Sequence, residues 1–156
     1  LDQWAILRAE ALQKEFIEAF DSYQFHVIYQ KLHNFCIVDM GGFYLDIIKD
    51  RLYTTKADSN ARRSAQTALY HIAEAFTRWI TPILSYTADE LWDALPQVEH
   101  REKTVFASQW YQFPQIHKVD EELGANYWQL IADVKDAVHK EIEPKRNEGG
   151  VGKARA

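Results

Sequence analysis

Cysteine, glycine, proline and long apolar runs are scarce in this sequence of 156 residues. The single cysteine, Cys36, cannot form an internal disulfide or a cysteine-based zinc site, which excludes a disulfide-dependent secreted fold and fits a reducing, cytoplasmic compartment. Six glycines and four prolines are too few for a collagen-like, linker-like or turn-rich all-β chain. No run of about 18 apolar residues spans a membrane, and no signal peptide is present. We therefore expect a soluble protein with no membrane partner, and the first residue, Leu1 instead of Met, indicates a piece of a longer chain.

The abundant residues indicate one compact, mostly helical domain. The composition is 47% hydrophobic and 13% aromatic, which is enough for a single buried core and argues against disorder. The net charge is −5, whereas RNA-binding domains usually carry a basic total. Positive charge is nevertheless concentrated in one place, because residues 49–63 contain five basic and two acidic residues. The sequence therefore combines an acidic total with a basic segment.

Apolar residues recur at three- and four-residue steps in five segments, and each is predicted to be an amphipathic helix. The predicted helices span about residues 2–20, 25–53, 61–80, 87–95 and 120–144, the last ended or bent by Pro144. Asp2 is predicted to cap the first, and Thr87 with Glu90 to form a capping box on the fourth. Gly41 and Gly42 interrupt the second, where they are expected to weaken the helix and allow close helix approach.

The segment 96–119 loses the helical period, and its residues 104–110 are predicted to form a short extended piece packed on the helices. The predicted fold is therefore all-α, an antiparallel bundle of about five helices with an irregular segment before the last helix. We expect one domain over residues 1–147 and a flexible tail, 148–156, leading to a missing C-terminal region. The shared core is predicted to contain Phe35, Ile47, Leu69, Phe76, Leu130 and Val134.

The sequence contains no convincing catalytic, metal or phosphate-loop motif. His26 and His33 lie one heptad apart without a third ligand nearby, so they are interpreted as ordinary polar residues. Cys36 falls within the apolar stripe and is predicted to be a buried structural thiol. The glycine-rich segment 149–154 lacks the spacing of a phosphate-binding loop. We therefore predict no catalytic residues and no metal ligands in this chain.

One helical face has the composition of an RNA-binding surface. Arg63, Gln66 and Tyr70 are spaced i, i+3, i+7 and lie off the apolar stripe, so they are expected to project together into solvent. Arginine neutralises phosphates, and a tyrosine ring stacks on unpaired bases. The alternative interpretation is an ordinary solvated helix face.

Three segments carry a specific resemblance. The sequences FYLDIIKDRLY at 43–53, NARRSAQTALY at 60–70 and TPILSYTADELW at 81–92 closely resemble the anticodon-binding helical domain of bacterial isoleucyl-tRNA synthetases. LDQWA, HNFC and ELGANYW occur in the order expected for that family, so the resemblance covers about residues 1–147. The valine enzymes of the same class resemble the chain second best.

The resemblance implies a tRNA-binding module of an ATP-dependent isoleucine-tRNA ligase, which docks on the anticodon stem and loop of an isoleucine-accepting tRNA. The family's catalytic signatures are missing, so we expect no enzymatic activity and no cofactor in this segment. The full-length protein is expected to be a cytoplasmic monomer with catalytic and editing domains that uses ATP and Mg, and Zn where a C-terminal zinc module is present. Two alternatives outside RNA binding are a protein-interaction module using exposed Trp110 and Tyr111, and a purely structural bundle.

The resemblance also assigns the residues expected to face RNA. It places the KDRLY motif of the family on residues 49–53 and its arginine-rich helix start on residues 62 and 63. Leu52 is expected to anchor the motif in the core and Asp50 to position Arg51 through an ion pair. Alternatively, Arg51 and Tyr53 close the junction between the second and third helices. The predicted RNA-binding residues, including two from the helix spacing, are Lys49, Arg51, Tyr53, Arg62, Arg63, Gln66 and Tyr70.

Overall fold

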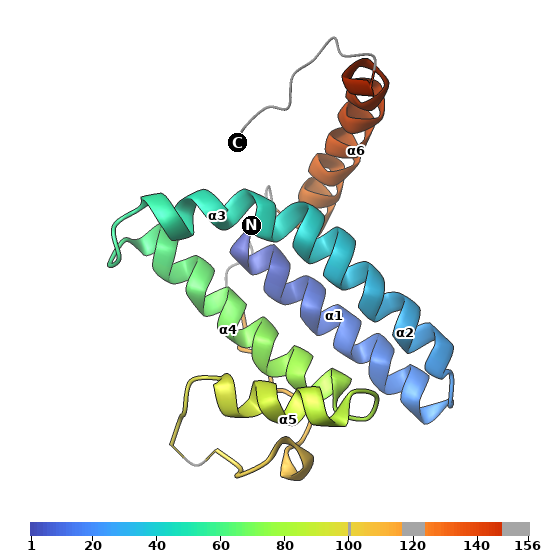
Figure 1. Ribbon diagram of the computed structural model, residues 1–156, viewed down its shortest axis with the longest axis vertical. Helices are drawn as coiled ribbons and strands as arrows, with labels where there is room; N and C mark the ends of the chain where they lie inside the picture. The colour runs from blue at the N-terminus through green and yellow to red at the C-terminus, as the bar shows by residue number, and fades with distance from the viewer. Residues whose placement is uncertain (100, 117–123, 148–156) are drawn as a thin grey trace. The chain divides into compact units, whose positions relative to one another are not determined.

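A computed structural model describes residues 1–99, 101–116 and 124–147, and within these ranges it contains helices and connections but no strand (Figure 1). The all-α prediction is confirmed. The helical elements are α1 (Asp2–Asp21), α2 (Phe25–Asn34), the π-helix η1 (Phe35–Tyr44), α3 (Leu45–Thr54), α4 (Asn60–Ile80), α5 (Ser85–Ala94), the 3₁₀ turn η2 (Val105–Ala107) and α6 (Ala125–Asn147). Because α2, η1 and α3 follow one another without a break, the described residues form five helical segments, in agreement with the predicted number of about five.

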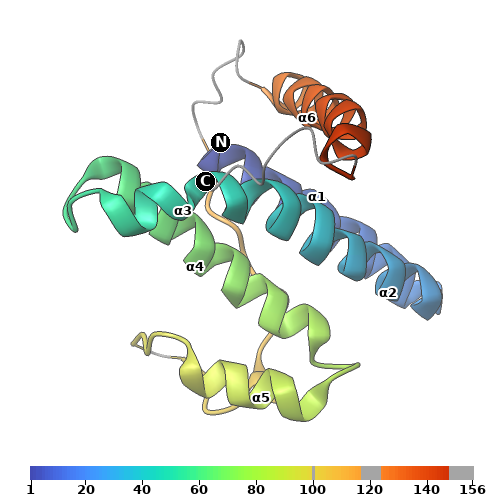
Figure 2. The same ribbon diagram turned by 45° about the horizontal axis from the view of Figure 1, so that its top comes forward.

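The chain divides into two compact units, residues 1–116 and 117–156. In the first, α1 packs against α2 and α4, and α4 also packs against α3 and α5. Figures 1 and 2 show α1 antiparallel to the helical run from α2 to α3, with α4 turning back beneath that run. The second unit contains α6, which continues through Pro144 to Asn147. No helix among the described residues is long and apolar enough to cross a bilayer.

Trp79 of α4 lies at the centre of the core. It is fully buried, and its ring meets those of Phe16 at 5.2 Å and Phe35 at 5.6 Å in edge-to-face contacts. Its indole nitrogen donates a 2.9 Å hydrogen bond to Gln13, which in turn donates to the Tyr111 carbonyl at 2.8 Å. A buried indole needs such a partner, and the chain of two hydrogen bonds ties α1, α4 and the irregular segment together.

The two glycines of η1 have a local role. A Cβ atom on Gly41 or Gly42 would lie 3.1 Å from the carbonyl oxygen five residues earlier. Such a contact is tighter than side chains usually accept, so the π turn favours glycine at both positions. Both glycines are exposed, and the predicted close approach of another helix is not seen in the first unit.

The predicted core was only partly correct. Phe35 is buried, and Leu69 and Phe76 pack against the core at its edge. Ile47 is 39% exposed while Ile48 is fully buried, because a π turn holds more residues than an α turn and rotates the apolar stripe by the time it reaches α3. Leu130 and Val134 are 60% and 52% exposed, and the core cluster consists of residues of the first unit.

Several other local predictions were wrong. Asp2 was predicted to cap α1, but Leu1 occupies the capping position and Asp2 is the first residue inside the helix. The fourth helix starts at Ser85 with no side-chain cap, so the Thr87 capping box does not form. Ser59 caps α4, since its hydroxyl accepts a hydrogen bond from the Arg62 amide at 3.3 Å. Cys36 is exposed, because it lies on the outer side of η1.

The irregular segment packs on the helices as predicted, with α5 as its partner, but residues 105–107 form a 3₁₀ turn where an extended piece was expected. Val105 is buried there with Trp92. Trp110 and Tyr111, predicted to be exposed under the interaction-module alternative, are half-buried against the core. The tail predicted at 148–156 lies outside the described residues.

Candidate nucleic-acid interface

The basic segment forms the turn between α3 and α4, which we call the α3–α4 corner and define as residues 49–66. Short polar side chains hold this corner in shape. Thr54 and Thr55 donate hydrogen bonds to carbonyl oxygens one turn earlier in α3, at 2.6 and 2.5 Å. Ser59 donates to the Thr55 hydroxyl at 3.1 Å while it caps α4. The connection is therefore ordered by local hydrogen bonds.

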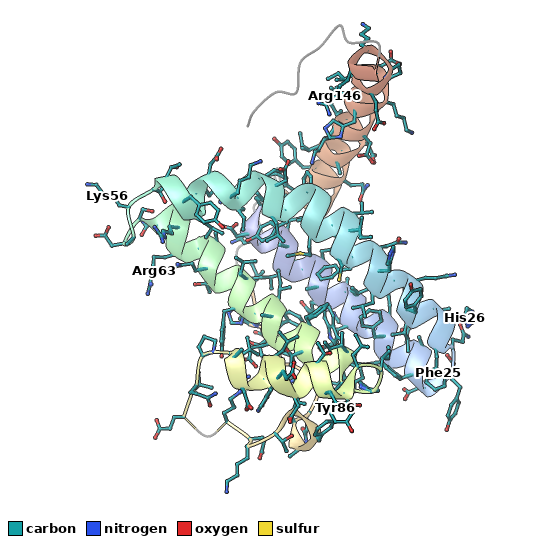
Figure 3. The ribbon with its side chains drawn as sticks, viewed as in Figure 1. Phe25, His26, Lys56, Arg63, Tyr86 and Arg146 are labelled. Atoms are coloured by element: carbon teal, nitrogen blue, oxygen red, sulfur yellow. The ribbon has the colours of Figure 1, made fainter. Side chains whose placement is uncertain are left out.

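Four long side chains of the corner are exposed: Tyr53, Lys56, Arg63 and Gln66. Tyr53 is 84% exposed at the end of α3. Figure 3 shows Lys56 and Arg63 pointing away from the protein, one from the connection and one from the first turn of α4. None of the four side chains has a hydrogen-bond or ion-pair partner among the described residues. Two cations, an aromatic ring and an amide of the α3–α4 corner therefore face solvent.

Lys49 is engaged but accessible. Its ammonium group pairs with Asp46 at 3.0 Å, one turn earlier on α3, and both side chains are well exposed. An exposed ion pair of this kind contributes about 0–1 kcal/mol, so a phosphate can replace the carboxylate at little cost.

Arg51 points toward the protein. Its guanidinium donates to the Asp2 carboxylate at 3.2 Å, and the Asp2 side chain is only 12% exposed. The carboxylate that positions Arg51 is therefore that of Asp2, from the start of α1, and the predicted pairing with Asp50 was wrong. Leu52 packs against the core, as expected.

Arg62 and Tyr70 also turn inward. The Arg62 guanidinium donates to the Thr55 carbonyl at 3.3 Å, and its Nε atom is buried. Tyr70 lines a pocket of about 460 Å³ together with Glu74, Arg78 and Arg101. Burial and the neighbouring Glu74 carboxylate raise the pKa of Tyr70. The structure therefore leaves Lys49, Tyr53, Arg63 and Gln66 accessible on the outside of the corner, and gives Arg51, Arg62 and Tyr70 partners within the protein.

A second group of charged and aromatic residues, which sequence reasoning missed, lies along the C-terminal half of α4. Glu74 is buried and pairs with Arg78 at 2.7 Å and with Arg101 at 2.9 Å. The Arg101 guanidinium lies 3.8 Å from the centre of the Trp92 ring. We call these four residues the Glu74 cluster. The i, i+4 spacing of Glu74 and Arg78 is typical of an ion pair on a helix, but nothing in the sequence indicates the contact of Glu74 with Arg101.

Residues beside the Glu74 cluster have shifted pKa values. His71 Nδ1 and the Tyr111 hydroxyl are 2.6 Å apart. Burial lowers the pKa of His71, and Glu74 opposes this shift. Burial, with the nearby Tyr70 and Glu74, raises the pKa of Tyr111 to about 12. These contacts fasten the irregular segment to α4. Within the described ranges, no group of three histidine, cysteine or carboxylate side chains is arranged to hold a metal ion.

Comparison with known proteins agrees with a nucleic-acid interface. A family model described as the anticodon-binding domain of tRNA ligase matches residues 2–156. The chain belongs to this family.

Several isoleucine–tRNA ligases are close relatives. The chain is 61% identical over 152 residues to that of Saccharophagus degradans and 58% identical over 154 residues to that of Teredinibacter turnerae, covering 97% of this chain in each case. It is 54% identical over 154 residues to that of Halorhodospira halophila. The chain spans 16% of the length of these relatives. The resemblance to the isoleucine enzymes, inferred from three short motifs, is thereby confirmed.

Proposed function

We propose that this chain binds the anticodon stem and loop of an isoleucine-accepting tRNA through the α3–α4 corner, as the tRNA-binding part of an ATP-dependent isoleucine–tRNA ligase. The observation that carries the proposal is the group of four exposed, unpaired side chains in the corner, Tyr53, Lys56, Arg63 and Gln66, in a chain of the anticodon-binding family. Each has a chemical use in RNA binding, and none has a structural use among the described contacts.

The roles follow from the chemistry of each side chain. Lys49, Lys56 and Arg63 are suited to phosphates, since cations at a surface displace the counterions of RNA. Tyr53 offers a ring face to an unpaired base of the anticodon loop, and Gln66 offers an amide to a base edge or a sugar. The contacts of Arg51, Arg62 and Tyr70 within the protein favour the alternative in which these three shape the corner.

The net charge of −5 is compatible with this proposal. An acidic surface outside the corner repels RNA, so tRNA is held only where the basic residues meet it, which favours one orientation over non-specific binding. Docking at the anticodon also places the acceptor end near the catalytic domain of the longer protein. Such a remote contact affects turnover as well as affinity, because its binding energy orients the reacting groups. In this proposal ATP, Mg²⁺ and any zinc belong to other domains.

The proposal is tested by titrating the full-length protein with isoleucine-accepting tRNA at several salt concentrations. We expect Arg63→Ala to weaken binding to matched and mismatched tRNA alike, and to lower the slope of log K against log salt by up to about one unit for the lost phosphate contact. Lys103→Ala is the matched control, because Lys103 is an exposed cation outside the corner. Equal, unchanged affinities for both variants, with the fold intact, would overturn the proposed surface.

A further inference from the structure

A single carboxylate connects the three helices that frame the α3–α4 corner. Asp2, at the start of α1, accepts hydrogen bonds from the Tyr44 hydroxyl at 3.0 Å, the Arg51 guanidinium at 3.2 Å and the Ser64 hydroxyl at 2.6 Å. These partners lie in η1, α3 and α4. Figures 1 and 2 both show the start of α1 beside α3. Both oxygens of the carboxylate are in use, and one of its partners is a cation.

The partners of Asp2 are near neighbours of the exposed residues. Arg51 precedes Tyr53 by two residues in α3, and Ser64 follows Arg63 in α4. Successive helical residues point about 100° apart. Asp2 therefore holds α3 and α4 within one helical turn of Tyr53 and Arg63. Tyr44, the third partner, is fully buried, so the carboxylate is fixed from the core.

The Asp2–Arg51 pair also determines how much positive charge the corner presents. The Arg51 side chain is 35% exposed, so its guanidinium lies near the surface and is neutralised there by a carboxylate that is 12% exposed. Without that carboxylate, the guanidinium would be an unpaired cation on α3, two residues from Lys49 and from Tyr53 in the sequence. It would then be available to any phosphate, regardless of sequence.

On the basis of the proposed function, we propose that Asp2 is a positioning residue for tRNA recognition. Its carboxylate sets the relative placement of α3 and α4, and so of Tyr53 and Arg63, and it keeps the Arg51 guanidinium from binding phosphates. Asp2 itself touches no RNA in this account. Its effect is on the discrimination between matched and mismatched tRNA more than on affinity.

The test measures tRNA binding by the full-length protein against salt, with matched and mismatched tRNA, together with the melting temperature. Asp2→Asn keeps the size of the side chain and removes its charge. We expect it to steepen the slope of log K against log salt by up to about one unit, as Arg51 gains a phosphate, and to reduce the preference for matched tRNA several-fold. Adding Arg51→Gln to Asp2→Asn should return the salt slope to its original value.

A matched control removes the other two hydrogen bonds to Asp2, those from Tyr44 and Ser64. Tyr44→Phe combined with Ser64→Ala leaves the Asp2–Arg51 pair in place, so the salt slope should stay unchanged even where the melting temperature falls. If Asp2→Asn does not fold, Asp2→Glu keeps the charge but displaces it, and should lower the preference for matched tRNA without changing the slope.

The outcomes separate the two proposals. A lower melting temperature for Asp2→Asn, with unchanged slope and unchanged preference, would show a purely structural role and overturn this inference alone. If only Asp2→Glu folds, an unchanged preference for matched tRNA in that variant would likewise overturn this inference. Failure of the unaltered protein to bind tRNA would instead overturn the proposed function and this inference with it.

Discussion

The two halves of α4 carry similar residues in opposite settings. At its N-terminal end, Arg63 of the α3–α4 corner is exposed and has no partner among the described residues. In its C-terminal half, the buried Glu74 carboxylate pairs with Arg78 of the same helix and with Arg101 of the irregular segment, whose side chain is only 5% exposed. Arginine and an aromatic ring therefore mark a binding surface in one place and a structural clamp in the other. Exposure and partners, not composition, distinguish the two.

The largest expected effect is on stability, and it comes from the Glu74 cluster. Glu74→Ala leaves Arg78 and Arg101 without their shared carboxylate in a buried site, which should cost about 3–5 kcal/mol of unfolding free energy. Chemical denaturation measures this directly. Glu90→Ala, which removes an exposed carboxylate of α5, should change stability by less than about 0.5 kcal/mol. Similar small losses for both variants would show that the cluster is not a clamp.

The next effect is on RNA affinity, and it concerns Tyr53. Replacing it with Ala should weaken tRNA binding by about 1–3 kcal/mol through the loss of a stacking ring, whereas Tyr53→Phe keeps the ring and should bind almost normally. The melting temperature should stay the same, because the side chain is 84% exposed. Tyr86, which is 90% exposed on α5, provides the matched control. Normal affinity with a reduced melting temperature for Tyr53→Ala would assign the ring to the helix junction instead.

The smallest expected effect is a pH dependence next to the Glu74 cluster. Because the pKa of His71 is lowered in the folded state, the unfolded chain binds more protons near the ordinary histidine value of 6.5. The unfolding free energy should therefore be highest above that pH and should decrease as the pH falls through it. Denaturation midpoints between about pH 7.5 and 5 test the sign. His71→Gln, which does not titrate, should flatten that part of the profile, and an unchanged profile would assign the pH dependence to other groups.

Periodicity alone was enough to predict α1, α4 and the continuous helical run through α2, η1 and α3. It failed where the chain departs from the α-helical repeat, since the π turn rotates the stripe and leaves Ile47 outside and Ile48 inside. It also could not divide the chain into two units or indicate that Leu130 is exposed. An amphipathic face shows that a helix has an apolar side, but not what covers it.

The candidate site was predictable as a segment but not as a surface. The KDRLY motif and the charge of residues 49–63 pointed to the corner, and Arg63 is exposed as its helix spacing predicted, while RNA binding by these residues stays a prediction. The inward turn of Arg51 depends on Asp2, 49 residues away in the sequence, and the burial of Arg101 depends on Glu74. Pairings of distant residues are set by tertiary packing, so no local pattern reveals them.

The most direct test of tRNA binding at the α3–α4 corner is amide hydrogen exchange of the full-length protein with and without isoleucine-accepting tRNA. If the α3–α4 corner binds the anticodon stem and loop, amides of the connection 55–59 and of the first turn of α4 should exchange more slowly in the complex. Amides of α5 and of residues 101–112 should exchange at the same rate in both states. Slower exchange in α5 and residues 101–112, with no change at the corner, would contradict RNA binding at the corner and place the RNA at the other end of α4.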